Sequence, residues 1–116
     1  MMQVPRMVIL GGGESGTGAA VLGKRLGYKV FLSDKGALKD ENRKELKALD
    51  IEFEEGKHSN EKILDATVVI KSPGIPDKAP VIQMLKETGI PVISEIELAA
   101  RHTKAKLIAK IGRAHI

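Results

Sequence analysis

Short apolar runs alternate with amphipathic stretches along this chain, which is the pattern produced when strands and helices take turns. The runs that predict strands are 7–10, 30–33, 51–53, 67–71, 92–94 and 107–111. The run at 67–71 is apolar at consecutive positions, as is typical of strands that helices cover on both faces. The alternation therefore predicts an α/β fold, a doubly wound parallel sheet in a single domain.

Four amphipathic stretches predict the main helices between these strands. They cover about 16–26, 39–49 and 79–88, and a further stretch that begins near 94. Ser94 and Glu97 have the spacing of a capping box, which predicts the start of the last helix. The positions expected to pack toward the sheet are Ala19, Ala20, Leu22 and Leu26 in the first helix and Leu38, Leu46 and Leu49 in the second.

A glycine-rich turn follows the first predicted strand, where Gly11, Gly13 and Gly16 fit the pattern G-x-G-x-x-G. In such a turn one glycine allows the tight bend, one lets the backbone approach a diphosphate, and one lets helix and strand pack closely. Asp34 ends the second apolar run, 18 positions after Gly16. That spacing is close to the ~20 positions expected for a carboxylate that meets a nucleoside. The pattern therefore predicts a nucleotide site.

A second loop, K-S-P-G-I-P at 71–76, follows the fourth predicted strand. The carboxyl edge of an open α/β sheet is where ligands bind, so this loop is a candidate for the same site. Ser72 offers a hydroxyl, Pro73 fixes the turn, and Gly74 permits close approach of a ligand. Turn chemistry alone leaves open that the loop only ends the strand.

Composition narrows the functional classes. The chain has 116 residues, a net charge of +4, three aromatic residues and no cysteine. Its basic residues stand mostly beside acidic ones, and too few aromatic rings are present for a base-stacking platform, so no nucleic-acid partner is expected. The histidines His58, His102 and His115 stand apart from other candidate ligands, which favours ordinary surface residues and no metal site.

The sequence also carries expectations about location. No apolar run approaches the ~18 residues of a membrane span, so no membrane segment is expected. The N-terminus lacks the long apolar stretch of a signal peptide, which favours a cytoplasmic protein. The lack of cysteine is consistent with that compartment.

Four motifs considered together resemble the Mur ligase family. They are the glycine turn, Ser33-Asp34, S-P-G-I-P at 72–76 and S-E-I-E-L at 94–98. The resemblance covers residues 6 to about 109, and within the family it is to the ligases that add D-glutamate to UDP-N-acetylmuramoyl-L-alanine in peptidoglycan synthesis. It implies a Rossmann-like first domain that holds the UDP part of the precursor. A central domain would bind ATP and Mg, and a third domain would bring the amino acid.

The resemblance also implies which residues bind the UDP moiety. The glycine turn would follow the diphosphate, the end of the second strand would hold the uridine, and the second loop would close over the nucleotide. A Glu14 carboxylate beside a diphosphate is unfavourable, so the role at that position is assigned to its backbone. The expected binding residues are Gly13, Glu14, Ser15, Gly16, Asp34, Lys35, Ser72, Pro73 and Gly74.

The end of the chain departs from the family pattern. Where the family continues into an ATP-binding phosphate loop, this sequence has K-I-G-R-A-H-I at 110–116, and no Walker lysine followed by Ser or Thr occurs in it. We therefore expect a UDP-binding domain at 1–109 and a non-native or truncated tail at 110–116, with the ATP-binding and C-terminal domains missing. Such a chain would contain no catalytic residue, bind no cofactor and be inactive alone.

Another class of function fits the glycine turn as well. A stand-alone NAD(H)-binding domain of regulatory or dehydrogenase type would use Asp34 to accept hydrogen bonds from the adenosine ribose. The spacing of the motif does not separate this alternative from the ligase domain. A nucleotide-free interaction domain would leave the glycine run unexplained.

Overall fold

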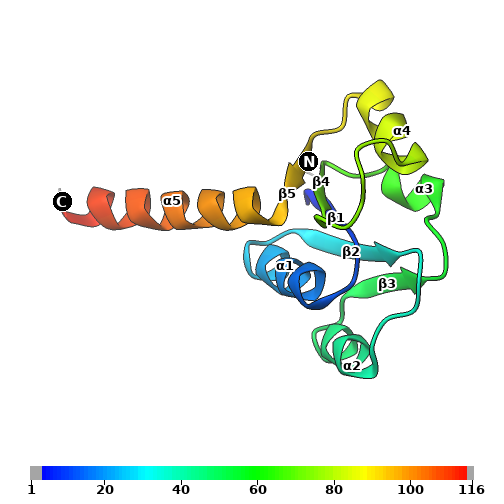
Figure 1. The fold of residues 1–116 in the computed structure, drawn as a ribbon. Coiled ribbons are helices and arrows are strands. Elements are labelled where there is room, and N and C mark those ends of the chain that lie inside the picture. Colours follow the sequence, from blue (N-terminus) through cyan, green and yellow to red (C-terminus); the bar gives the residue numbers. More distant parts are fainter. Residues whose placement is uncertain (1–3, 115–116) are drawn as a thin grey trace.

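A computed structural model describes residues 4–114 of the chain, with side chains to Lys106 except that of Ala105, and shows a parallel sheet between two layers of helices (Figure 1). The five strands lie in the order β3-β2-β1-β4-β5. The α/β, doubly wound, Rossmann-like fold class is confirmed. In chain order the elements are β1 (Arg6–Leu10), α1 (Glu14–Arg25), β2 (Lys29–Asp34), α2 (Asp40–Ala48), β3 (Glu52–Glu55), α3 (Asn60–Ile63), β4 (Val68–Lys71), α4 (Pro80–Thr88), β5 (Val92–Ser94) and α5 (Glu95–Ala114).

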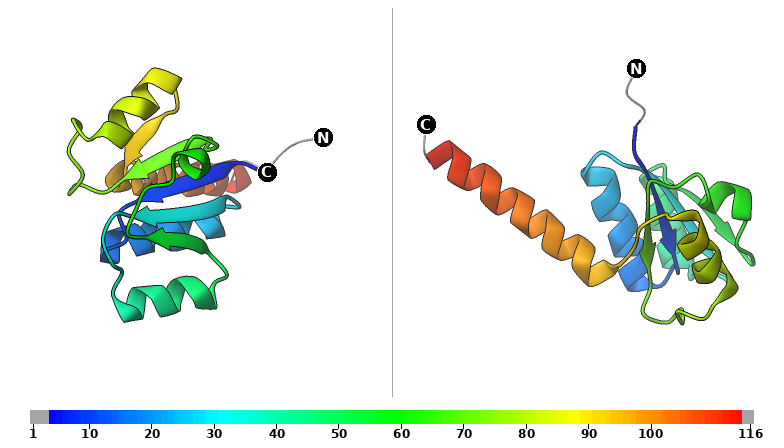
Figure 2. Two further views of the ribbon diagram at one scale, coloured as in Figure 1. Left: turned by 90° about the vertical axis from the view of Figure 1, so that its right-hand side faces the viewer. Right: turned by 90° about the horizontal axis from the view of Figure 1, so that it is seen from above.

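The core has two parts because side chains of a strand alternate between the faces of the sheet. Met7 and Ile9 of β1 pack with α1, α2 and the start of α5, whereas Val8 and Leu10 pack with α3 and α4. All four side chains are fully buried. Figure 2 shows the two helical layers on either side of the sheet. Helices on both faces are what the apolar strands predicted.

Five of the seven predicted sheet-facing positions pack as expected. Ala19, Ala20, Leu38 and Leu46 are buried, and Leu22 packs at the edge of the same core. The prediction was wrong for Leu26 and Leu49, each of which is 38% exposed. Both residues are the C-caps of their helices, so they lie beyond the stretch in which helical periodicity sets the buried face.

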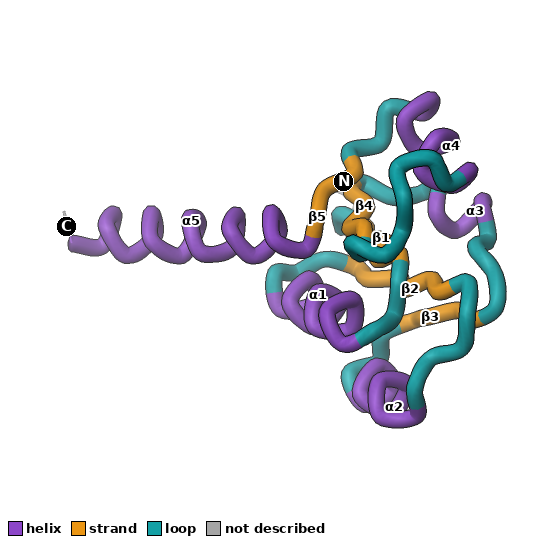
Figure 3. The backbone as a smooth tube through the Cα atoms, viewed as in Figure 1, coloured by secondary structure: helices purple, strands orange, loops and turns teal. Residues whose placement is uncertain are grey.

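The predicted sixth strand at 107–111 is wrong. These residues belong to α5, a helix of 20 residues that extends away from the rest of the molecule (Figure 3). One of the two hydrogen bonds of the predicted capping box is observed: the Ser94 Oγ accepts a hydrogen bond from the Glu97 N–H at 3.0 Å. No glycine or proline occurs between Glu95 and Ile111 to stop a helix once it has started. The sheet therefore ends at β5.

Candidate nucleotide-binding site

Three loops meet at the carboxyl edge of the sheet, after β1, β2 and β4. The Gly11 N–H donates to the Ser33 carbonyl at 2.9 Å, and the Ser72 N–H donates to the Leu10 carbonyl at 3.0 Å. A Cβ added to Gly11 would lie only 2.6 Å from the Cβ of Ser72. The structure therefore brings the glycine turn, the end of β2 and the loop after β4 together, as the sequence predicted.

The glycines of the turn have different roles. Gly11 has a φ of +104°, in the region that favours glycine, and forms the bend. A Cβ on Gly16 would lie 1.8 Å from the Gly11 carbonyl oxygen, so Gly16 is needed for close packing of α1 on the turn. A Cβ on Gly13 would meet no protein atom within 4 Å. Gly13 therefore faces open space that a ligand can use.

The first turn of α1 offers backbone donors next to this space. The first intrahelical hydrogen bond runs from the Thr17 N–H to the Gly13 carbonyl, at 2.9 Å. Consequently the N–H groups of Glu14, Ser15 and Gly16 have no acceptor within the helix, and no side chain caps them. Glu14 and Ser15 are also exposed. Such a helix start, with its positive dipole end, suits an anionic group.

Asp34 organises the glycine turn. Its Oδ2 accepts a hydrogen bond from the Gly12 N–H at 2.6 Å, and its Oδ1 accepts one from the Gly36 N–H at 2.8 Å. The Gly12 carbonyl lies 3.4 Å from both the Thr17 hydroxyl and the Asn42 side-chain amide, which donate to it. The sequence reasoning missed Thr17 and Asn42, which fix the position of Gly12.

The loop after β4 is held from within by Lys71. Its Nζ donates to the Ile75 carbonyl at 2.6 Å and lies 3.3 Å from a carboxylate oxygen of Asp77. Pro73 and Gly74 remain exposed at the edge of the sheet. This arrangement gives the loop a defined shape while leaving its tip available for contact with a ligand.

The sequence did not predict a polar cluster that lies at the carboxyl ends of β2 and β3. Ser33 is fully buried, and its hydroxyl oxygen lies 2.8 Å from Glu54 Oε2 and 2.7 Å from His58 Nδ1. The Glu54 carboxylate also accepts hydrogen bonds from the N–H and the hydroxyl of Ser59. His58, which the sequence favoured as an ordinary surface residue, is half-buried.

The cluster changes the acidity of both titratable groups. Burial raises the pKa of Glu54, but the hydrogen bonds from Ser59 and Ser33 outweigh it, so the net pKa lies below its usual value. Burial lowers the pKa of His58, and the charges of Glu54 and Asp34 offset only part of that effect. At neutral pH the structure therefore favours a charged Glu54 and an uncharged His58.

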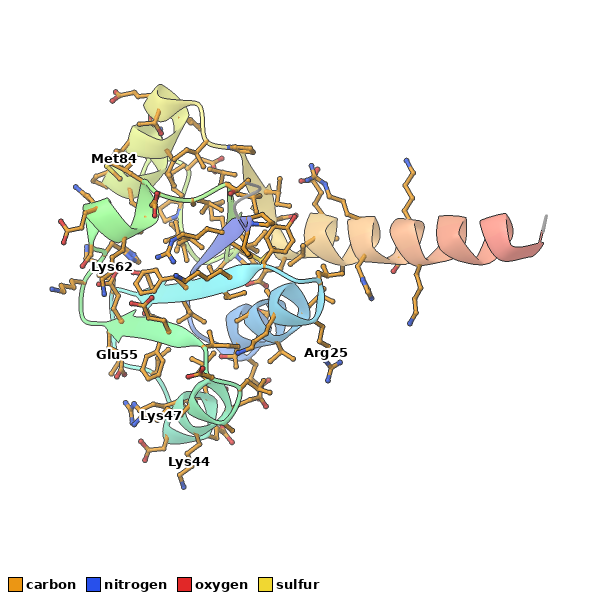
Figure 4. All side chains as sticks on the ribbon, turned by 180° about the vertical axis from the view of Figure 1, so that it is seen from behind. Arg25, Lys44, Lys47, Glu55, Lys62 and Met84 are labelled. Carbon is orange, nitrogen blue, oxygen red and sulfur yellow. The ribbon has the colours of Figure 1, made fainter. Side chains whose placement is uncertain are left out.

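A cleft of about 470 Å³ opens beside this cluster. It lies between the residues that follow β2 and β3 and the first turn of α4, and its volume is in the range of small-molecule sites. Met84 of α4, labelled in Figure 4, lines one side of it. The lining residues most relevant to binding are Lys35, Lys57, His58, Ala79, Pro80 and Met84.

Comparison with known proteins identifies the family. The family model of the MurD N-terminal domain matches residues 6–81. This chain belongs to that family. A UDP-N-acetylmuramoylalanine--D-glutamate ligase of Christiangramia forsetii is 57% identical over 107 residues, and one of Bacteroides fragilis is 53% identical over the same length. These matches cover 92% of this chain but only 24% of each ligase. The chain thus spans about a quarter of the length of its relatives.

Solved structures show the same fold. The crystal structure of the UDP-N-acetylmuramate-alanine ligase MurC from Thermotoga maritima matches with a TM-score of 0.73 and 23% identity. The match covers 86% of this chain and 23% of MurC. The match to the MurD N-terminal domain family does not favour the alternative of a stand-alone NAD(H)-binding domain.

Between residues 4 and 114, no three or more histidine or acidic side chains lie close enough together to hold a metal ion. In the same part of the chain, no helix has both the length and the apolar character needed to cross a membrane.

Proposed function

We propose that this chain is the UDP-precursor-binding domain of an ATP-dependent ligase that adds D-glutamate to UDP-N-acetylmuramoyl-L-alanine in peptidoglycan synthesis. The observation that carries the proposal is the open space at Gly13 beside three backbone donors, in a chain of the MurD N-terminal domain family. A diphosphate matches that space because its charge suits the helix start.

In this proposal the diphosphate lies against Gly13 and accepts hydrogen bonds from the N–H groups of Glu14, Ser15 and Gly16. The loop after β4 covers the nucleotide from the other side with the part-buried Ser72 and the exposed Pro73 and Gly74. Lys35 supplies positive charge at the uridine end. Asp34 holds Gly12 and Gly36 through its two oxygens, and each oxygen keeps a second lone pair that can accept a hydrogen bond from the uridine.

The chemistry of the ligase belongs to parts of the parent protein outside this chain. The sequence has no Gly-Lys-Ser or Gly-Lys-Thr, the motif that ends an ATP-binding phosphate loop, so this chain does not fit ATP bound in that way. We assign ATP, Mg and the D-glutamate site to the remaining three quarters of a full-length ligase acting in the cytoplasm. The role of this chain in the reaction is to bind and orient the precursor.

Calorimetric titration of the chain with UDP-N-acetylmuramoyl-L-alanine, UDP and NADH tests the proposal. The two uridine compounds should bind and NADH should not. Binding of NADH without binding of either uridine compound at millimolar concentration, an affinity weaker than about −4 kcal/mol, would overturn the proposal.

A further inference from the structure

The glycine turn contains two successive glycines, and the peptide group between them can face either way. Gly12 and Gly13 have no Cβ, so rotation about ψ of Gly12 and φ of Gly13 meets little steric resistance. In a trans peptide the C=O of one residue and the N–H of the next point in opposite directions. One orientation of this peptide therefore turns an N–H toward the open space beside Gly13, and the other turns a carbonyl oxygen toward it.

The structure holds this peptide in one orientation. The Gly12 carbonyl accepts from the Thr17 hydroxyl of α1 and from the Asn42 side-chain amide of α2, each 3.4 Å away. No cis peptide bond occurs in the described residues, so the Gly13 N–H points the opposite way, away from α2. Gly13 is exposed, and its N–H makes no hydrogen bond within the described part of the chain.

The Gly13 N–H adds a fourth donor to the three at the start of α1. The N–H groups of Glu14, Ser15 and Gly16 have no acceptor within the helix. Successive backbone N–H groups of this kind form a concave site for an anion. The orientation of the Gly12–Gly13 peptide thus decides whether a diphosphate meets four donors, or three donors beside a repulsive carbonyl oxygen.

Asn42 is a polar residue on the buried side of α2. It lies four residues from both Leu38 and Leu46, and only 8% of it is exposed. Burial of a side-chain amide costs free energy unless the amide is hydrogen-bonded. Within the described part of the chain the Asn42 amide donates to one group, the Gly12 carbonyl. The polar group at this position therefore serves the contact with the turn.

The two donors to the Gly12 carbonyl share the task. A carbonyl oxygen has two lone pairs, so it can accept from Thr17 and Asn42 together. Each contact is longer than the usual N–H···O distance of about 2.9–3.0 Å, so each is a weak restraint by itself. Thr17 lies only five residues from Gly12 in the chain, whereas Asn42 ties the turn to a separate helix.

We propose that Asn42 is a positioning residue of the diphosphate site, which keeps the Gly13 N–H directed at the ligand by holding the Gly12 carbonyl in the interior. The inference rests on the proposed function and adds to it a residue that acts through the turn, without contact to the nucleotide. Asp34 holds the preceding peptide through the Gly12 N–H. The two successive peptides of the turn are thus each held by a side chain from outside it.

Asn42→Leu removes the amide and retains a side chain of similar size. It should weaken UDP binding about 3- to 10-fold, the range for loss of one hydrogen bond, and leave binding of uridine, which has no phosphate, unchanged. The matched control is Leu46→Val, one turn along the same buried face, which should lower the urea midpoint and leave UDP binding unchanged. UDP binding that Asn42→Leu leaves intact, or weakens by the same factor as uridine binding, would overturn the inference.

The Gly13 amide gives a readout in the wild-type chain. In nitrogen-15 NMR spectra, UDP should shift the Gly13 amide proton downfield, as expected for a hydrogen bond to a charged phosphate, and uridine should not. Saturating UDP should shift this proton less in Asn42→Leu. A Gly13 amide that UDP leaves unshifted, while the Glu14 and Ser15 amides respond, would overturn the inference and retain the proposed function. Failure of wild type to bind UDP would instead overturn the proposed function, and this inference with it.

Discussion

The Asp34 carboxylate accepts a hydrogen bond from the Gly12 N–H at 2.6 Å and thereby ties the end of β2 to the glycine turn after β1. Its other oxygen accepts the Gly36 N–H at 2.8 Å. Both contacts use backbone donors, so Asp34 fixes the shape of the site from within. The carboxylate at the end of β2 therefore affects ligand binding through the turn that it supports.

This arrangement predicts the effect of Asp34→Asn. An asparagine has only one side-chain oxygen, so its NH₂ group would face either the Gly12 or the Gly36 N–H. We expect a loss of about 1.5–3 kcal/mol in the free energy of unfolding, the range for a hydrogen bond to a charged group, together with weaker UDP binding. Urea denaturation and hydrogen exchange of the Gly12 amide measure the two structural effects.

The matched control for Asp34→Asn is Lys35→Gln. Lys35 is exposed, and its replacement should leave the stability unchanged while weakening UDP binding. If Asp34→Asn weakened UDP binding without changing Gly12 exchange or stability, the carboxylate would act by direct contact with the nucleotide instead.

The glycines of the turn should respond differently to substitution. Gly13→Val places its side chain in the open space proposed for the diphosphate and meets no protein atom there. The substitution should therefore abolish UDP binding with little change in circular dichroism. Gly16→Ala should destabilise the fold itself, because its Cβ would lie 1.8 Å from a backbone oxygen. Gly18→Ala, at an exposed helical position with no atom near the added Cβ, should raise stability by about 0.5–1 kcal/mol and leave binding unchanged. Unchanged UDP affinity in Gly13→Val would mean that the turn has only a structural role.

The local elements could be predicted because their signals lie in neighbouring residues. An apolar strand followed by G-x-G-x-x-G specifies a turn and a helix start, and the structure has both. The run at 107–111 failed because a short apolar run fits a strand and a helix equally, and the capped start at Ser94 decided for a helix. The short helix α3 spans only four residues, too few for helical periodicity to appear.

The polar contacts of the site could be predicted less well because they depend on strand register. Asn42 was detectable, since it lies four residues from both Leu38 and Leu46 on the buried side of α2, but its partner Gly12 was not. His58 had no sequence signal. Its contact with Ser33 depends on the pairing of Ser33 with Glu54 across β2 and β3, which only the structure defines. The domain division near residue 109 and the nature of the tail at 110–116 stay predictions, and His115 lies outside the described residues.

The ion pair between Arg43 and Glu55 predicts an acid-dependent contribution to stability. Arg43 Nη2 lies 2.8 Å and Nε 3.2 Å from the two Glu55 oxygens, and the Leu38 N–H also donates to Glu55. The hydrogen bonds from Arg43 hold the pKa of Glu55 below its usual value. A carboxyl group whose pKa is lower in the folded state stabilises the protein at pH values above its unfolded-state pKa. This stabilisation is lost as the pH falls through the folded-state pKa.

Glu55→Gln should therefore lower the urea midpoint at pH 7 and have a smaller effect at pH 3, where the wild-type carboxylate is largely protonated in the unfolded chain. Glu61→Gln, at an exposed position of α3, serves as the control and should change neither midpoint. An equal loss at both pH values would show that Glu55 contributes through packing and not through charge.

The cap of α5 predicts a local effect on stability. Removing the Ser94 hydroxyl leaves the Glu97 N–H without its acceptor, so Ser94→Ala should cost about 1 kcal/mol, and Ser94→Asp should retain the cap. Thr103→Ala is the control, because the Thr103 hydroxyl only donates back to the Ala99 carbonyl within the helix. Circular dichroism during urea denaturation measures the helix directly. Equal stability of the Ser94→Ala and Ser94→Asp variants would contradict the capping role.

The lowered pKa of His58 predicts that stability decreases as the pH decreases, over a pH range higher than the one in which Glu55 is protonated. Burial keeps the ring neutral in the folded state, although Glu54 and Asp34 oppose this effect, while Lys35 adds to it. Below a pH of about 6.5 the unfolded chain therefore binds a proton that the folded chain does not, and stability decreases as the pH falls toward the folded-state pKa. The slope should be at most about 1.4 kcal/mol per pH unit, the limit for one proton. Urea denaturation between pH 7 and pH 5 should show this slope in wild type and in His102→Gln, and His58→Gln should remove it. A slope that persists in His58→Gln would place the proton uptake at another group and contradict a neutral His58 in the folded state.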